Sequence, residues 1–164
     1  SIEKNAMANT PEQPDQLTSF HPVTADDINQ LMTVESASHS HPWTEKTMLS
    51  CIGGRYFGYY VLSADNQLLG FYIGEYVAGE STLMNICVKP EVQGQGLGRK
   101  LLNHFHHQAR SLGAEEAFLE VRAKNINAIM LYINHEYVEI NRRIGYYPAE
   151  TGYEDAIVMR KKLD

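Results

Sequence analysis

Three glycines at alternate positions, Gly94, Gly96 and Gly98, lie in the stretch VQGQGLGRKLL and directly precede a helix-forming sequence. Glycine lets a backbone approach a ligand closely, and the first N–H groups of a helix have no intrahelical acceptor. A helix N-terminus also carries a partial positive charge, so such a loop favours phosphate binding. The plain alternative is an ordinary glycine-rich turn into a helix.

Two well-known nucleotide motifs do not match this loop. A dinucleotide fingerprint needs Gly-x-Gly-x-x-Gly in an early strand-turn-helix unit, whereas this loop has a shorter spacing and lies in the middle of the chain. A nucleotide P-loop needs Gly-Lys-Ser/Thr, whereas Gly98 is followed by Arg99 and Lys100. The sequence therefore keeps the phosphate-binding chemistry without either fingerprint.

The elements before the loop are predicted from hydrophobic period. Apolar residues at helical spacing predict a helix over residues 24–35, and Thr44 can cap a second, short helix. The following segments have the period of strands. They are rich in aromatic and branched residues and are separated by short turns. These strands, at 56–63, 68–77 and 81–88, predict an antiparallel meander.

The second half of the chain alternates between the two periods. The helix after the glycine loop ends at Gly113, which suits a left-handed C-terminal cap. The remaining elements are a strand at 117–122, a helix at 125–135 and strands near 137–143 and 154–162. The order predicts an α+β fold, a mixed sheet flanked by helices.

Composition limits both organisation and partners. The 164 residues suit one domain, which we place at residues 20–164. A net charge of −6 argues against nucleic acid or an anionic membrane as partner and favours a basic one. Cys51 and Cys87 lack metal-type or disulfide spacing, so we expect reduced thiols, a cytoplasmic protein and no metal. We expect a monomer or a weak dimer.

The first residues are set apart from this domain. Residues 1–19 are polar and lack a hydrophobic period, which predicts a flexible tail. Within it, Met7 is expected to be the native start and residues 1–6 an added segment. No apolar run is long enough for a membrane span or resembles a signal peptide.

The glycine loop also resembles a known family motif. Gln93-Gly94-Gln95-Gly96-Leu97-Gly98, on a predicted strand-to-helix turn, is similar to the Gln/Arg-x-x-Gly-x-Gly/Ala motif of the Gcn5-related N-acetyltransferases (GNAT). Further segments resemble, in the same order, the bacterial ribosomal-protein alanine N-acetyltransferases (RimI type). They are HPWTE at 41–45, LEVR at 119–122, NINA at 125–128, RRIGYYP at 142–148 and EDAIVM at 154–159. The resemblance runs from about residue 19 to the end and implies the GNAT fold, a predominantly antiparallel central sheet with flanking helices.

The resemblance implies roles for individual residues. Acetyl-CoA is the implied cosubstrate, Glu120 the general base and Tyr132 the general acid. Trp43, Tyr146 and Tyr147 are implied to shape the groove for a ribosomal protein's N-terminal peptide. The implied cofactor-binding residues are Ile86, Cys87, Val88, Gly94, Gln95, Gly96, Leu97, Gly98, Arg99 and Asn125.

The residue types suit amine acetylation. An N-terminal amine has a pKa near 8 and must lose a proton before it attacks a thioester, so a carboxylate such as Glu120 is a sensible acceptor, directly or through water. A phenol such as Tyr132 can protonate the departing thiolate, and Cys87 is not needed as a nucleophile. The plain alternatives are a solvent-facing Glu120, a core Tyr132, an Asn125 that only caps its helix, and Tyr146 and Tyr147 as hairpin packing.

Two further features belong to helices. His104, His106 and His107 do not share one helix face, so we interpret them as solvated surface and not as metal ligands. Glu136 stands where the family usually has a glycine that ends a helix in a left-handed turn. A positive φ at Glu136 would cost on the order of 1 kcal/mol.

The predicted activity is acetyl transfer from acetyl-CoA to the N-terminal alanine of small-subunit ribosomal protein eighteen. The same fold acting on a lysine side chain, a polyamine or an antibiotic is one alternative. The others are a module that senses acetyl-CoA without turnover, and nucleotide binding by the glycine loop.

Overall fold

A computed structural model describes residues 19–164 of the chain, so all but the last residue of the predicted tail, and the predicted start at Met7, lie outside the described part. One sheet of seven strands has the order β1-β2-β3-β4-β5-β7-β6. β4 and β5 are parallel and every other pair is antiparallel, which confirms the predicted mixed sheet. The strands are β1 (Ser19–Pro22), β2 (Tyr56–Leu62), β3 (Leu68–Val77), β4 (Glu80–Val88), β5 (Glu116–Arg122), β6 (Val138–Pro148) and β7 (Tyr153–Lys162).

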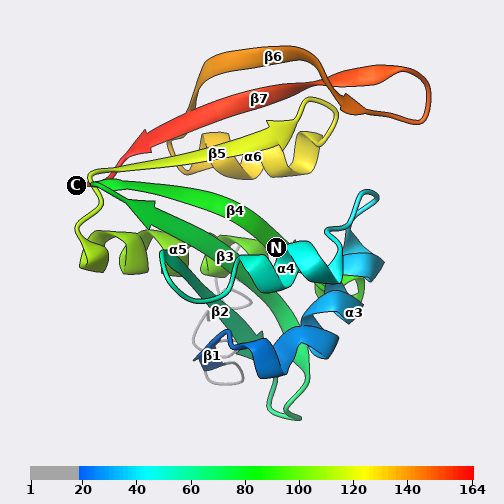
Figure 1. The fold of residues 1–164 in the computed structure, drawn as a ribbon, viewed down its shortest axis with the longest axis vertical. Coiled ribbons are helices and arrows are strands. Elements are labelled where there is room, and N and C mark those ends of the chain that lie inside the picture. Colours follow the sequence, from blue (N-terminus) through cyan, green and yellow to red (C-terminus); the bar gives the residue numbers. More distant parts are fainter. Residues whose placement is uncertain (1–18) are drawn as a thin grey trace, which may run out of the picture.

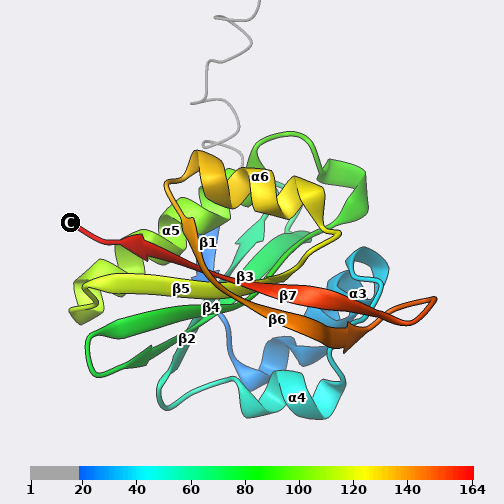
Figure 2. The same ribbon diagram turned by 90° about the horizontal axis from the view of Figure 1, so that it is seen from above.

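Helices cover both faces of this sheet. They are α3 (Ile28–Ser38), α4 (Glu45–Ser50), α5 (Leu97–Leu112) and α6 (Ile126–Asn134), with 3-10 turns η1 (Ala25–Asp27) and η2 (Pro90–Val92). α5 and α6 lie on one side of the sheet and α4 on the other (Figure 2). None of the helices between residues 19 and 164 is long and apolar enough to cross a membrane.

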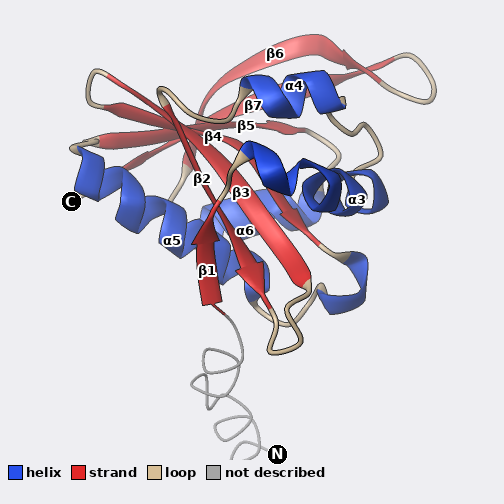
Figure 3. Ribbon diagram, turned by 60° about the horizontal axis from the view of Figure 1, so that its bottom comes forward, coloured by secondary structure: helices blue, strands red, loops and turns tan. Residues whose placement is uncertain are grey.

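The N-terminal part differs from the prediction in two ways. β1 was not predicted, and it extends the meander by pairing with β2 (Figure 3). The helix predicted at 24–35 is instead η1 followed by α3, because Asp27 accepts a hydrogen bond from the Thr24 amide at 2.7 Å and closes a separate first turn. α3 then continues to Ser38, which carries the helix end to the sheet edge.

Two buried apolar clusters hold the helices on the sheet. On one face, Leu101, Leu102 and Phe105 of α5 pack with residues of β4, β5 and α6. On the other face, Leu31 and Val34 of α3 pack with residues of α4, β3 and β4. Each cluster removes large apolar side chains from water, which is the main favourable contribution to folding.

Two predicted helix ends are confirmed. Gly113 follows α5 with a φ of +101°, and its N–H bonds back to Arg110 O at 3.0 Å. Glu136 follows α6 with a φ of +71°, a region that costs free energy for a residue with a Cβ. The left-handed turn is thus kept without its usual glycine.

Candidate active site

β4 and β5 are neighbours for only part of their length. Their pairing ends at Leu83 and Leu119, although β4 runs on to Val88 and β5 to Arg122. The two strands meet at one end and spread apart toward the other (Figure 1). A cavity of about 620 Å³ lies between them, lined also by the end of α3, the start of α6 and the far end of the β6–β7 hairpin.

A bulge in β4 shapes one wall of this cavity. Ile73 pairs with Asn85 and the next residue, Gly74, pairs with Leu83, so Met84 is an extra residue in β4. A bulge reverses the alternation of the residues after it. Leu83 therefore packs in the α5 cluster, whereas Cys87, four positions later, packs in the α3 cluster. The same reversal turns Asn85 toward α3.

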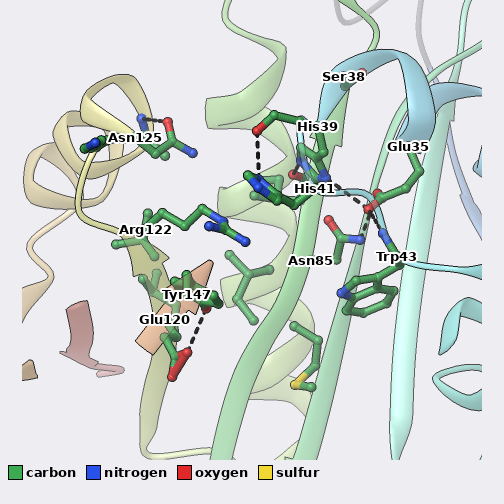
Figure 4. A pocket seen from close by; sticks show the side chains of 18 of the residues that line it. Glu35, Ser38, His39, His41, Trp43, Asn85, Glu120, Arg122, Asn125 and Tyr147 are labelled. Carbon is green, nitrogen blue, oxygen red and sulfur yellow. Dashed lines mark hydrogen bonds and ion pairs between the residues drawn. The ribbon is translucent and has the colours of Figure 1, made fainter. Parts of the chain in front are cut away.

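Glu120 lies at the wall formed by β5. The Tyr147 hydroxyl donates to Glu120 Oε1 at 2.7 Å (Figure 4). Arg143 Nε lies 3.5 Å from Glu120 Oε2. Burial first, and then the bond and charge of Glu120, raise the pKa of Tyr147, so its phenol stays protonated and donates. The carboxylate is thus held by both of its oxygens inside the cavity.

Arg122 connects β5 to the hairpin. Its Nη1 donates to Pro148 O at 3.0 Å and to Glu154 Oε1 at 3.1 Å, and its guanidinium lies 4.1 Å from the centre of the Tyr147 ring. These contacts fix the Tyr147 side chain beside Glu120.

Tyr132 and Asn125 come from α6 and line the same cavity. Tyr132 is 5% exposed, and burial raises the pKa of its phenol well above the usual value, so the hydroxyl keeps its proton. Asn125 caps α6, because its Oδ1 accepts from the Ala128 amide at 3.3 Å. Asn125 therefore serves as a cap and also faces the cavity.

The glycine loop lies outside the cavity lining, beyond the end of β4. Gly94 and Gly96 have φ of +80° and +86°, and α5 begins at the next residue after Gly96. Gln93 Nε2 donates to Val88 O at 2.9 Å and ties the loop to β4. Left-handed glycines before the N-terminus of a 16-residue helix suit a diphosphate.

Sequence reasoning missed the wall formed by α3. Glu35 is fully buried and accepts hydrogen bonds from the Trp43 amide at 2.9 Å, Asn85 Nδ2 at 2.9 Å and His39 Nδ1 at 3.1 Å (Figure 4). Burial by itself raises the pKa of Glu35, but these three bonds outweigh it and hold the pKa below its usual value. Two signals were present: a carboxylate on the apolar face of its helix, and a histidine four positions later.

The predicted site residues fall into three groups. Glu120, Tyr132, Asn125, Ile86, Trp43 and Tyr147 line one cavity. Tyr146 lies beside it, 51% exposed, with its ring 5.2 Å from that of Tyr147. The remaining predicted residues, Cys87, Val88 and the glycine loop, lie outside the lining.

The prediction that the α5 histidines are solvated surface is wrong for two of three. His106 is 3% exposed and bonds to the Tyr137 hydroxyl at 2.8 Å, and His104 bonds to the Tyr72 hydroxyl at 2.8 Å. His106 lies one turn after Leu102, on the apolar stripe of α5. Of the three, only His107 is exposed.

A different cluster, Glu35, His39 and Cys87, has metal-type donor atoms within 4.8 Å of one another. Each already has a hydrogen-bond partner, including Val34 O for the Cys87 thiol. Burial raises the pKa of Cys87 to about 12, which opposes the thiolate that a metal would need. These three side chains therefore fit a hydrogen-bonded cluster better than a set of metal ligands.

Comparison with known proteins finds a matching family and similar relatives. Residues 26–136 match the Acetyltransferase (GNAT) family. The [ribosomal protein bS18]-alanine N-acetyltransferase of Salmonella typhimurium is 41% identical over 133 residues, 81% of this chain and 89% of that protein.

Solved structures show the same fold. The crystal structure of the ribosomal-protein-S18-alanine N-acetyltransferase from Escherichia coli matches with a TM-score of 0.86 and 36% identity, covering 90% of this chain and 95% of that one. A spermidine/spermine N-acetyltransferase from Vibrio cholerae matches with a TM-score of 0.75 at 17% identity, covering 91% and 94%. At that identity the likeness concerns the fold alone, so the fold does not select the acceptor amine.

Proposed function

Since the chain belongs to the acetyltransferase (GNAT) family, we propose that it acetylates the N-terminal alanine of ribosomal protein bS18 from acetyl-CoA. The observation that carries this proposal is that one cavity, between two spread strands, holds both a carboxylate, Glu120, and a protonated phenol, Tyr132. The 41% identical relative that bears this activity in its name supports the choice of acceptor. The site of action we propose is the cytoplasm.

The residues present fit acetyl-CoA. The glycine loop would hold the diphosphate, Asn125 would contact the cofactor, and the Ile86–Val88 backbone would pair with its pantetheine arm. When bound, acetyl-CoA supplies an activated acetyl thioester. Val88 lies farther along β4 than the cavity lining, and Gln93 Nε2 ties the start of the glycine loop to Val88 O.

Proton transfer falls to two side chains. Glu120 takes a proton from the incoming amine, directly or through water, and Tyr147 and Arg143 orient the carboxylate for that step. Tyr132 gives its phenolic proton to the departing sulfur, because burial keeps that phenol protonated at neutral pH. Both transfers can occur without a covalent enzyme intermediate.

Trp43, Tyr146 and Tyr147 would border the peptide. Trp43 comes from the segment before α4, and the two tyrosines come from the β6–β7 hairpin on the other side of the cavity. The net charge of −6 would attract a basic ribosomal tail. Specificity for alanine would then arise from the space between these side chains and the acetyl donor.

The test is release of coenzyme A, followed with a thiol reagent, on a peptide that copies the bS18 N-terminus. The free peptide should be turned over and the same peptide blocked at its N-terminus should not. Glu120→Gln should lower kcat about 100-fold and Tyr132→Phe by roughly 10-fold to 100-fold. Turnover of spermidine or a lysine peptide but not of the alanine peptide would overturn the substrate, and cofactor binding without any turnover would favour a sensor.

A further inference from the structure

The end of α3 takes the place of a neighbouring strand along the open part of β4. Lys89 N donates to Leu69 O in β3, so the alternate residues Ile86 and Val88 turn their N–H and C=O groups away from β3. Their carbonyls accept from α3 and its C-terminal cap: His39 Nε2 lies 3.2 Å from Ile86 O, and Ser38 Oγ lies 2.9 Å from Val88 O. The carbonyl acceptors of Ile86 and Val88 are occupied, so their N–H groups are the donors that this edge can offer to a ligand.

His39 can make both of its contacts only as a cation. Nδ1 lies 3.1 Å from the Glu35 carboxylate and Nε2 lies 3.2 Å from the Ile86 carbonyl, and neither oxygen can donate. Burial by itself lowers the pKa of His39, but the bond and charge of Glu35, and then the Ile86 carbonyl, raise it above the usual value. Glu35 cannot turn away, since the Trp43 amide and Asn85 hold it.

The other groups around His39 do not replace this charge. The Cys87 thiol of β4 lies within 4.8 Å and is neutral, because burial raises its pKa to about 12. The opposite wall carries Glu120, Arg122, Lys124 and Glu154, with Tyr132 and Tyr147 as neutral phenols. Within residues 19–164, Glu35 is the only charged side chain that bonds to His39.

We propose that His39 is a positioning residue for acetyl-CoA, which as an imidazolium fixes the Ile86 peptide unit so that the β4 edge offers its donors to the cofactor. A neutral His39 would keep its one proton on Nδ1 for Glu35, because a bond to a carboxylate is the stronger one. The Nε2 lone pair would then face the Ile86 carbonyl and repel it. This inference rests on the proposed function, since only that proposal places acetyl-CoA on this edge.

The test is the Kd of acetyl-CoA, measured by titration calorimetry between pH 6 and pH 9, with no peptide present. The wild-type protein should bind roughly 10-fold more weakly once His39 is neutral. His39→Gln should bind about 10-fold more weakly already at pH 6 and lose this pH dependence. Glu35→Gln should move the weakening to lower pH, because His39 loses its counter-charge.

His107→Gln is the matched control. It removes an exposed imidazole from α5, away from the cavity, and should follow the wild-type curve. The cofactor's own titration is common to all four proteins and cancels in the comparison. If circular dichroism shows that Glu35→Gln does not fold, NMR titration of His39 in the wild type replaces it, with a midpoint expected above the ordinary histidine value of about 6.5.

Parallel pH curves for the wild type and His39→Gln would overturn the positioning role, as would an NMR midpoint for His39 below about 6.5. Absence of acetyl-CoA binding at every pH would overturn the proposed function and this inference together. Binding that is tight but independent of pH would overturn the inference alone.

Discussion

His39 and His106 lie on opposite faces of the sheet, and the first is a cation whereas the second is neutral. His39 meets a carboxylate and a carbonyl, both acceptors, and its pKa is raised. His106 meets the Tyr137 hydroxyl, and burial first, then the charges of Lys161, Arg110 and His135, lower its pKa to about 3. His106 is buried and His39 is half-buried, and for both rings burial by itself lowers the pKa, so the bonded partner and not burial alone decides which histidine is charged.

The two regions therefore respond to pH in opposite directions. The folded pKa of His39 is raised, so its contribution to stability is full below the unfolded pKa of about 6.5 and is lost as pH rises through the folded value. The folded pKa of His106 is depressed, so stability is lost as pH falls below about 6.5, until about pH 3. The α3 side weakens in base and the α5 side weakens in acid.

The largest expected effect comes from removing the partner that charges His39. Glu35→Ala leaves the Asn85 amide, the Trp43 amide and a half-buried imidazole without their acceptor. Loss of one partner of a buried pair should lower the free energy of unfolding by about 3 kcal/mol, measured by urea denaturation at pH 7. Glu91→Ala, at an exposed position, is the control and should change stability little.

A loss below 1 kcal/mol for Glu35→Ala would show that the three donors find water instead. The difference between the pKa values of His39 and His106 would then come from how far water reaches each ring and not from the partner to which each ring is bonded.

The second effect concerns the neutral histidine. Between pH 6.5 and pH 4.5, wild-type protein should lose roughly 2 kcal/mol more stability than His106→Leu, because only the wild type must keep a titrating ring neutral. Urea denaturation at the two pH values measures this difference. His107→Gln should keep the wild-type dependence, and equal acid losses in wild type and His106→Leu would contradict the assignment of His106 as neutral.

The smallest effect tests the left-handed residue near His106. Glu136→Gly relieves the positive φ of +71° and should raise the free energy of unfolding by about 1 kcal/mol, partly offset by the unfolded-state entropy of glycine. The substitution also removes the Glu136 contact to Lys161 Nζ at 3.2 Å, so the NMR midpoint of His106 should fall further. A destabilised Glu136→Gly protein would show that the side chain contributes more than the turn costs.

Much of the fold could be predicted because its signals are local. The apolar stripe of α5, the Gly113 cap and the aromatic and branched residues of β3 each lie within one segment of sequence. The strand β1 could not be predicted, since four residues have no period of their own and are ordered by pairing with β2. The bulge at Met84 left no glycine to mark it.

The candidate site divides in the same way. Glu120, Tyr132 and Asn125 were named through resemblance, and the structure places them in one cavity while their roles stay predictions. The hydrogen-bonded cluster around Glu35 could not be predicted from the sequence pattern. Its member Asn85 is 50 positions away and faces Glu35 only because of the bulge. Contacts of that range depend on three-dimensional pairing and leave no spacing in the sequence.

The extra residue in β4 restricts how this chain can vary. Removing Met84 would turn Asn85 and Cys87 from the α3 face to the α5 face, and adding a second residue would have the same result. Insertions and deletions are therefore expected in turns such as that of Asp65 and Asn66, and not between Leu83 and Val88. We therefore expect β4 to tolerate the exchange of single residues but not a change in their number.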